Sequence, residues 1–257
     1  MASKKPIPLV VGNWKMNPST LAEAKRLVVQ LRTLARKFTP DVSVVVVPPS
    51  IYLSDLTRLS PSGRLQFGVQ NVWPGSTGAQ TGEISVSMAS SCGATYVIIG
   101  HSERRASGET DEQIAAKYQS VAASKLTPIL CVGEATRDPS GDYYAVVETQ
   151  LTRALAGSKK AQLKRTVIAY EPVWAIGTGQ TSTPADVEEM RLFIDKCLTK
   201  LFDRATARAV RVLYGGSVNQ KNATELFIHG GVDGFLVGGA SLRSAEFARI
   251  VASVSST

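Results

Sequence analysis

Residues 166–202 read TVIAYEPVWAIGTGQTSTPADVEEMRLFIDKCLTKLF, and this stretch contains one complete strand–loop–helix unit. Its first five residues are mostly apolar, which is typical of a strand that is buried on both faces of a parallel sheet. After the loop, Thr183 is a suitable helix N-cap and Pro184 a suitable first helical residue, and acidic residues follow in the first turn. A strand that leads into such a helix is the repeating unit of α/β folds.

The same alternation continues on both sides of this unit. Buried-type apolar runs predict strands at residues 9–13, 42–47, 65–69, 96–99, 128–132, 166–170, 210–213 and 234–237. Amphipathic segments between them predict helices at residues 21–38, 111–124, 143–155, 184–202 and 219–229. No linker or low-complexity tract interrupts the pattern. The sequence therefore predicts an α/β fold in which residues 1–257 form one (β/α)8 barrel domain, with the working residues at the carboxyl ends of the strands.

Composition excludes several classes of protein. The length of 257 residues fits one barrel, which takes about 250 residues. No run approaches the roughly 18 apolar residues of a membrane span, so no membrane partner is expected. The three unevenly spaced cysteines form neither a disulfide framework nor a zinc pattern, so we expect no metal site. With no signal-peptide pattern at the N-terminus, these features predict a cytoplasmic protein.

The net charge of +8 comes from Lys and Arg residues that are spread along the chain. A nucleic-acid-binding protein concentrates its basic residues on one face, often beside stacking aromatics. We therefore expect no nucleic-acid partner, but a solvated basic surface that attracts anionic substrates.

Glu171 is the first candidate catalytic residue, because it ends the strand at 166–170 and leads into an apolar loop. A carboxylate at a strand end, below a loop with Pro at one hinge and Gly at the other, indicates a general base under a lid that excludes water. A surface glutamate at a strand–loop junction is the alternative, and the apolar loop residues argue against it. The residues predicted to form the lid are Pro172, Val173, Trp174, Ala175, Ile176, Thr178 and Gly179.

Two other predicted strands end at polar residues. Lys15 follows the first strand, where an ammonium group can hold a phosphorylated anion and stabilise developing negative charge. His101 follows the fourth strand at the start of a predicted helical turn, whose positive end favours a neutral imidazole. Glu103 is the predicted ion-pair partner of Lys15. From the residues alone, a surface lysine and a packing histidine remain open as alternatives.

Glycine pairs follow the last two predicted strands, as Gly215-Gly216-Ser217 and Gly238-Gly239. Exposed backbone N–H groups in such loops bind phosphate, and the loops after strands seven and eight form the usual phosphate site of a barrel. Together with Glu171, they predict proton chemistry on a small phosphorylated substrate.

With these residues in place, the chain closely resembles the triosephosphate isomerase family from about residue 10 to residue 247. The resemblance rests on GNWKMN at 12–17, GHSERR at 100–105, CVGE at 131–134, YEPVWAIGTG at 170–179, YGGS at 214–217 and GFLVGGA at 234–240. It implies a TIM barrel that interconverts dihydroxyacetone phosphate and D-glyceraldehyde 3-phosphate through a cis-enediolate. It also implies that the reaction needs no metal or organic cofactor.

The resemblance also implies a role for each site residue. Glu171 moves the proton between two carbons, while His101 and Lys15 stabilise the oxyanion. Asn13 lies beside them, and Glu103 holds Lys15 in place. The residues implied to contact the phosphate are Gly177, Ser217, Gly238 and Gly239, and those implied to press on the base when the lid shuts are Ile176 and Leu236.

Members of this family are usually homodimers, in which a loop after the third strand enters the active-site rim of the other subunit. That loop is residues 72–83 here, and it keeps Thr81, Gly82 and Glu83. It has Gln80 where the family generally has an aromatic residue, which predicts a weaker dimer.

Two further departures from the family pattern affect local stability. Only Ala106-Ser107 separates Arg105 from Gly108, where the family usually has three residues. Asp195 stands where the family usually has an arginine, so Asp233 is expected to lack its customary partner.

Two other functions remain to be weighed. A different phosphosugar barrel, such as an epimerase or lyase, would share the late-strand phosphate site but would not need the segment from Glu171 to Gly179. A barrel without catalysis could bind anions or polynucleotides through its positive charge. The leading prediction is an isomerase whose partner is a small phosphorylated triose.

Overall fold

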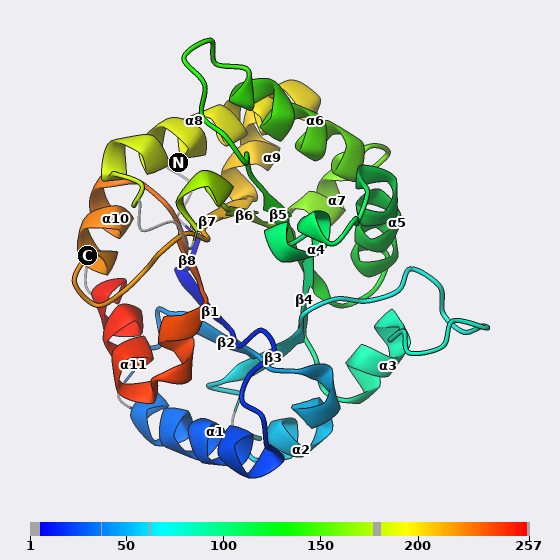
Figure 1. The fold of residues 1–257 in the computed structure, drawn as a ribbon, viewed down its shortest axis with the longest axis vertical. Coiled ribbons are helices and arrows are strands. Elements are labelled where there is room, and N and C mark those ends of the chain that lie inside the picture. The colour runs from blue at the N-terminus through cyan, green and yellow to red at the C-terminus, as the bar shows by residue number, and fades with distance from the viewer. Residues whose placement is uncertain (1–5, 37, 62, 177–180, 256–257) are drawn as a thin grey trace.

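The computed structural model describes residues 6–36, 38–61, 63–176 and 181–255. Eight parallel strands form a closed barrel in chain order, in which β1 pairs with both β2 and β8. Helices surround the barrel, so the predicted (β/α)8 fold is confirmed (Figure 1). The strands are β1 (Leu9–Asn13), β2 (Ser43–Val47), β3 (Gln66–Val69), β4 (Tyr96–Ile99), β5 (Thr127–Val132), β6 (Val167–Tyr170), β7 (Arg211–Tyr214) and β8 (Gly234–Val237).

The helices form an outer ring around these strands (Figure 1). Within the described ranges, none is both long enough and apolar enough to cross a membrane. The α-helices are α1 (Leu21–Ala35), α2 (Leu53–Arg58), α3 (Val86–Ser91), α4 (Ser102–Ala106), α5 (Asp111–Ala122), α6 (Tyr143–Leu155), α7 (Lys160–Leu163), α8 (Pro184–Leu201), α9 (Arg204–Ala209), α10 (Ala223–His229) and α11 (Ser244–Ser253). The 3-10 turns are η1 (Ser50–Tyr52), η2 (Val173–Ala175) and η3 (Gly239–Leu242).

Several predicted helix boundaries were wrong, and some strand ends differ by one residue. Helix α1 stops at Ala35 rather than 38, α5 at Ala122 rather than 124, and α8 at Leu201 rather than 202. Helix α10 begins at Ala223 rather than 219, because the side chain of Asn219 accepts the Lys221 N–H at 2.8 Å and so forms a turn.

Helices α2, α3, α7, α9 and α11 were not predicted from the sequence. Four of them have six residues or fewer, which is too short for a helical period to stand out. The longer α11 does have such a pattern, because Phe247, Ile250 and Val251 all face the core. Helix α6 was predicted with both boundaries correct.

The core has two parts, separated by the barrel wall. Alternate strand residues such as Leu9, Val11 and Ile98 point inward and fill the barrel. The residues between them, such as Val10, pack outward against buried helix residues such as Leu31. Because both faces of each strand are buried, the sequence shows continuous apolar runs, and the polar residues begin where the strands end.

Candidate active site

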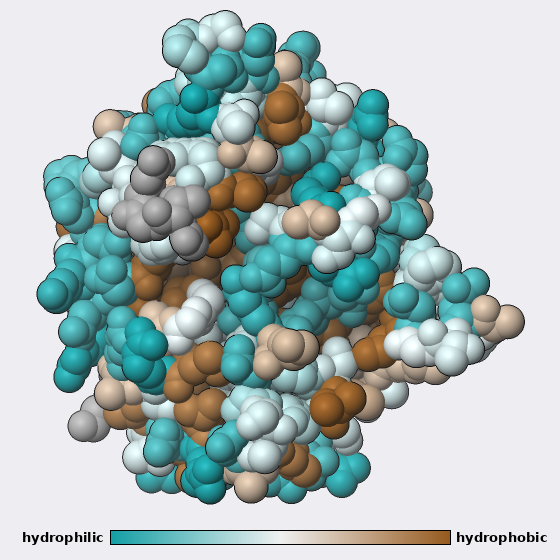
Figure 2. Space-filling view, viewed as in Figure 1, coloured by the Kyte–Doolittle hydropathy of each residue, from teal (hydrophilic) through white to brown (hydrophobic). Residues whose placement is uncertain are grey.

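Nine of the predicted site residues line a single pocket of about 290 Å³ at the carboxyl ends of the strands. The space-filling view shows a hollow near the middle of the face, with hydrophobic residues on one side of it and hydrophilic residues on the other (Figure 2). Glu103 lines an adjoining pocket, and Gly177, Thr178 and Gly179 lie outside the described residues. The predicted residues that line the 290 Å³ pocket are Asn13, Lys15, His101, Glu171, Ile176, Ser217, Leu236, Gly238 and Gly239.

The Glu171 side chain is 2% exposed and lies directly after β6. Its Oε2 atom accepts the backbone N–H of Ser102 at 2.8 Å. Its Oε1 atom lies 3.0 Å from Nε2 of His101, but the two are not aligned as a hydrogen bond. One carboxylate oxygen is therefore anchored at the start of α4, and the other faces the imidazole.

His101 caps the N-terminus of α4, the short helical turn predicted at this position. Its Nδ1 atom accepts the backbone N–H of Glu103 at 3.2 Å, so that nitrogen carries no proton. A neutral imidazole in this position carries its proton on Nε2, the nitrogen near Glu171. The neutral ring that the sequence predicted stays a prediction.

Lys15 has a left-handed backbone with φ of 54°, which is uncommon for a residue other than glycine and costs about 1–3 kcal/mol. The side chain of Asn13 accepts the Lys15 N–H at 3.1 Å, and Gln70 Nε2 donates to the Lys15 carbonyl at 2.6 Å. The Lys15 ammonium forms the predicted ion pair with Glu103 at 2.6 Å. Neither the backbone strain nor the role of Gln70 was predicted from the sequence.

Both glycine loops line this pocket together with Lys15. A methyl group at Gly238 would lie 3.8 Å from the Lys15 ammonium nitrogen, so this amine lies against the second loop. A methyl group at Gly239 would meet open space. The loops therefore leave room for an anion beside a cation.

Comparison with known proteins gives the family of the chain. Residues 8–254 match the sequence profile of the family described as triosephosphate isomerase. The chain belongs to this family. It is 48% identical to the triosephosphate isomerase of Herpetosiphon aurantiacus over 95% of this chain and 98% of that protein. It is 46% identical to those of Marinobacter nauticus (94% of this chain, 95% of that protein) and Roseiflexus sp. (95% and 96%). The chain is thus an enzyme of the isomerase class.

In this triosephosphate isomerase family member, the described part of the predicted lid begins at Pro172 and continues as the 3-10 turn η2. Ile176 lines the pocket, and Ala175 is 1% exposed. The indole N–H of Trp174 donates to Glu134 Oε1 at 2.8 Å. Thr183 caps α8 on the far side of the lid with a Pro at the first helical position, as predicted.

The loop at residues 72–83 projects away from the barrel between β3 and α3 (Figure 1). Gln80, Thr81 and Gly82 are exposed. Gly82 and Glu83 also line the second pocket of about 290 Å³, together with Lys15.

The structure also shows the surroundings of Asp195 and of the shortened segment at Ala106-Ser107, the other two departures from the family pattern. Asp195 pairs with Arg191, one helical turn earlier on α8. Asp233 accepts the backbone N–H of Val212 at 2.8 Å, and within the described ranges its carboxylate has no ion-pair partner. Burial raises the pKa of Asp233. The shortened segment at Ala106-Ser107 ends α4 and leads to a glycine with positive φ.

Some residues that hold the site together were not predicted. The N–H of Ser102 holds the base, and its position at a helix start could have indicated this donor. Glu134 belongs to the quoted family motif, but nothing in its local sequence indicates that it binds Trp174. Over the described part of the chain, no group of three or more His, Cys, Asp or Glu residues could hold a metal ion.

Proposed function

We propose that this enzyme interconverts dihydroxyacetone phosphate and D-glyceraldehyde 3-phosphate, with Glu171 as the general base. The observation that carries this proposal is the convergence of Glu171, His101 and Lys15 on one pocket that also contains both glycine loops. The names of the relatives support the same reaction.

The mechanism follows from where these groups lie. The substrate phosphate binds the backbone N–H groups of the loops at Ser217 and at Gly238-Gly239. The carbonyl oxygen then faces the Nε2–H of His101 and the ammonium of Lys15. Glu171 removes a proton from the carbon next to the carbonyl, and these two donors stabilise the negative charge that develops on oxygen. By way of His101, a proton passes from the neighbouring hydroxyl oxygen to the former carbonyl oxygen. The protonated Glu171 then returns its proton to the former carbonyl carbon, which completes the isomerisation.

The enediolate intermediate must be protected from water and from loss of its phosphate. We assign this protection to the lid at residues 172–179, with Gly177 as a further phosphate contact. On the described side, Ile176 and Leu236 supply apolar walls to the pocket that contains Glu171. Removing water strengthens every electrostatic interaction in the pocket.

The assembly and the cellular setting belong to the same proposal. We propose a homodimer in which the loop at residues 72–83 enters the second pocket of the other subunit, beside Lys15 and Glu103. Cys92, Cys131 and Cys197 are free thiols, as expected for a glycolytic enzyme of the cytoplasm.

Replacing the base tests the proposal directly. Glu171→Gln removes the proton acceptor but keeps the shape of the side chain, so kcat should fall by about 10² to 10⁴. The assay couples formation of dihydroxyacetone phosphate to a dehydrogenase that oxidises NADH. Glu188→Gln, at an exposed position of α8, is the matched control and should retain full activity. An active Glu171→Gln enzyme would refute the assignment.

The same assay separates the two alternatives. A different phosphosugar barrel would leave D-glyceraldehyde 3-phosphate unchanged while still binding inorganic phosphate. An anion-binding barrel without catalysis would lack isomerase activity and bind polynucleotides in a salt-sensitive manner.

A further inference from the structure

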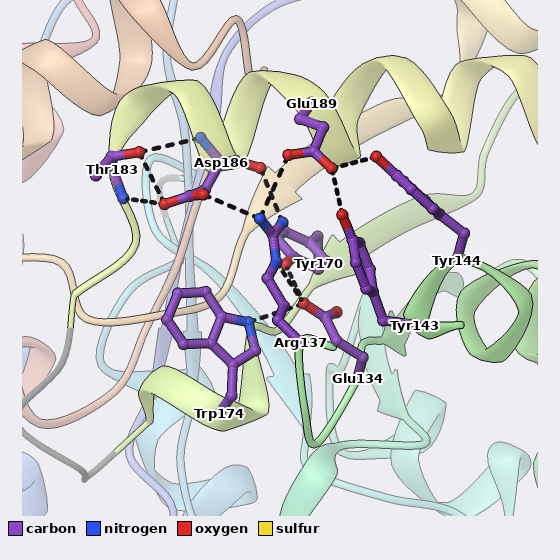
Figure 3. Close-up of polar contacts among 9 residues, drawn as sticks. All are labelled: Glu134, Arg137, Tyr143, Tyr144, Tyr170, Trp174, Thr183, Asp186 and Glu189. Atoms are coloured by element: carbon purple, nitrogen blue, oxygen red, sulfur yellow. Dashed lines mark hydrogen bonds and ion pairs between the residues drawn. The ribbon is translucent and has the colours of Figure 1, made fainter. Parts of the chain in front are cut away.

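Glu134 makes hydrogen bonds on both sides of the catalytic base. Its carboxylate Oε1 accepts the hydroxyl of Tyr170, the residue before Glu171, at 2.8 Å. The same oxygen accepts the indole N–H of Trp174 at 2.8 Å, and the Glu134 backbone carbonyl accepts the N–H of Val173 at 3.1 Å. The backbone that carries Glu171 is therefore held from both directions by one residue of the neighbouring loop (Figure 3).

The Glu134 carboxylate is 1% exposed, and a buried negative charge is costly unless a cation compensates it. Arg137 provides that cation, because its Nε lies 3.3 Å from Glu134 Oε1. The guanidinium carbon also lies 5.5 Å from the centre of the Trp174 ring and 5.0 Å from that of Tyr143. Arg137 therefore contacts both Glu134 and the indole that Glu134 binds.

Arg137 also reaches the other end of the lid. Its Nη1 donates to Asp186 Oδ1 at 2.9 Å and to Glu189 Oε2 at 3.3 Å, both on α8. Asp186 in turn accepts the backbone N–H of Thr183, the cap residue that follows the lid, at 2.8 Å. A single guanidinium thus joins the segment that enters the lid to the helix that leaves it (Figure 3).

Glu189 is held in turn by two tyrosines from the start of α6. The hydroxyls of Tyr143, at 2.7 Å, and of Tyr144 both donate to Glu189 Oε1. Burial acts to raise the pKa of Glu189, but these hydroxyls and Arg137 outweigh it and leave the pKa lowered, so the carboxylate stays charged. The two tyrosines therefore hold the Glu189 carboxylate in place, and this carboxylate in turn holds Arg137.

We propose that Arg137 is a positioning residue for the catalytic base, and that Glu189, Tyr143 and Tyr144 keep its guanidinium in place. This inference rests on the proposed function, because Glu171 is the group being positioned. Arg137 acts through Glu134, Tyr170 and Trp174 and does not touch the substrate. A base that is displaced by about 1 Å loses about 10²-fold in rate, so small movements in this network affect catalysis.

The test compares wild type with Arg137→Gln, Glu189→Gln and the double variant Glu134→Gln/Arg137→Gln, with Glu188→Gln as control. Steady-state kinetics give kcat and KM separately, and thermal melting reports folding. Arg137→Gln should lower kcat by about 10- to 100-fold and change KM by less than about threefold, because the phosphate loops are untouched. Glu189→Gln keeps the arginine and should lower kcat by a smaller factor.

The double variant separates positioning from a general loss of structure. The amide introduced by Glu134→Gln is neutral and can still accept from Tyr170 and Trp174, so the double variant should recover several-fold of the kcat that Arg137→Gln loses. If Arg137→Gln does not fold, Glu189→Gln and the double variant carry the test. The inference is overturned if the folded variants keep kcat within twofold of wild type, or if the double variant recovers nothing. Loss of activity in wild type itself would refute the proposed function and this inference with it.

Discussion

Gly215 is in close contact with the base, and substituting it gives a quantitative test of how accurately Glu171 must be placed. A methyl group at this position would lie 3.0 Å from Cγ of Glu171 and 3.2 Å from the Tyr170 carbonyl oxygen. Ordinary contacts of this kind begin at 3.4 Å, so in Gly215→Ala the base must move by about 0.4 Å or more. At about 10²-fold per ångström, a movement of about 0.4 Å should lower kcat about sixfold.

Stability should also fall in Gly215→Ala. Overpacking costs about 1–3 kcal/mol, and each kcal/mol lowers Tm by about 2–4 °C in a chain of this size. The coupled isomerase assay gives kcat, and inhibition by inorganic phosphate reports on the loop at Gly238-Gly239, which the new methyl does not meet. The reasoning is refuted if kcat stays within twofold of wild type while Tm falls as expected.

Two further predictions concern the departures from the family pattern. The pKa of Asp233 is raised in the folded chain, so its ionisation costs stability at pH 7, and this cost disappears as the pH falls through the folded pKa. Asp233→Asn should therefore raise Tm by about 2–4 °C at pH 7 and have little effect below pH of about 4, and a melt that shows no gain at pH 7 would contradict this. Gln80→Tyr should tighten the proposed dimer about tenfold by adding aromatic contact, measured by sedimentation over a dilution series. A wild-type dimer that persists at nanomolar concentration would argue against a weakening role for Gln80.

The fold could be predicted because the barrel buries both faces of every strand. That requirement gives runs such as residues 96–99 an unbroken apolar character, and the runs alternate with helical patterns along the whole chain. The helix boundaries were less predictable, since the side chain of Asn219 makes a hydrogen bond that competes with the helix.

The central site residues were also predictable, because parallel strands bring their carboxyl ends to one side of the sheet. Glu171 follows β6 directly, and His101 follows β4 after one residue. Their proximity therefore follows from the topology of the barrel. The contacts that hold these site residues in place could not be predicted from the topology. Arg137 lies in a polar loop, so the sequence alone indicates an ordinary exposed arginine. Its partners on α8 are 49 and 52 residues away in the sequence. The left-handed backbone of Lys15 depends on Gln70, which is 55 residues away.

The pairing of β1 with β8 has a consequence for synthesis of the chain on the ribosome. Leu9 is matched with Gly234, some 225 positions later, so the first strand emerges long before the strand that covers its open edge. At about 5–20 residues per second, that edge is exposed for roughly 10–45 s in every nascent chain. An uncovered strand edge can pair with other polypeptides, so molecular chaperones have a defined target and a defined period in which to shield it.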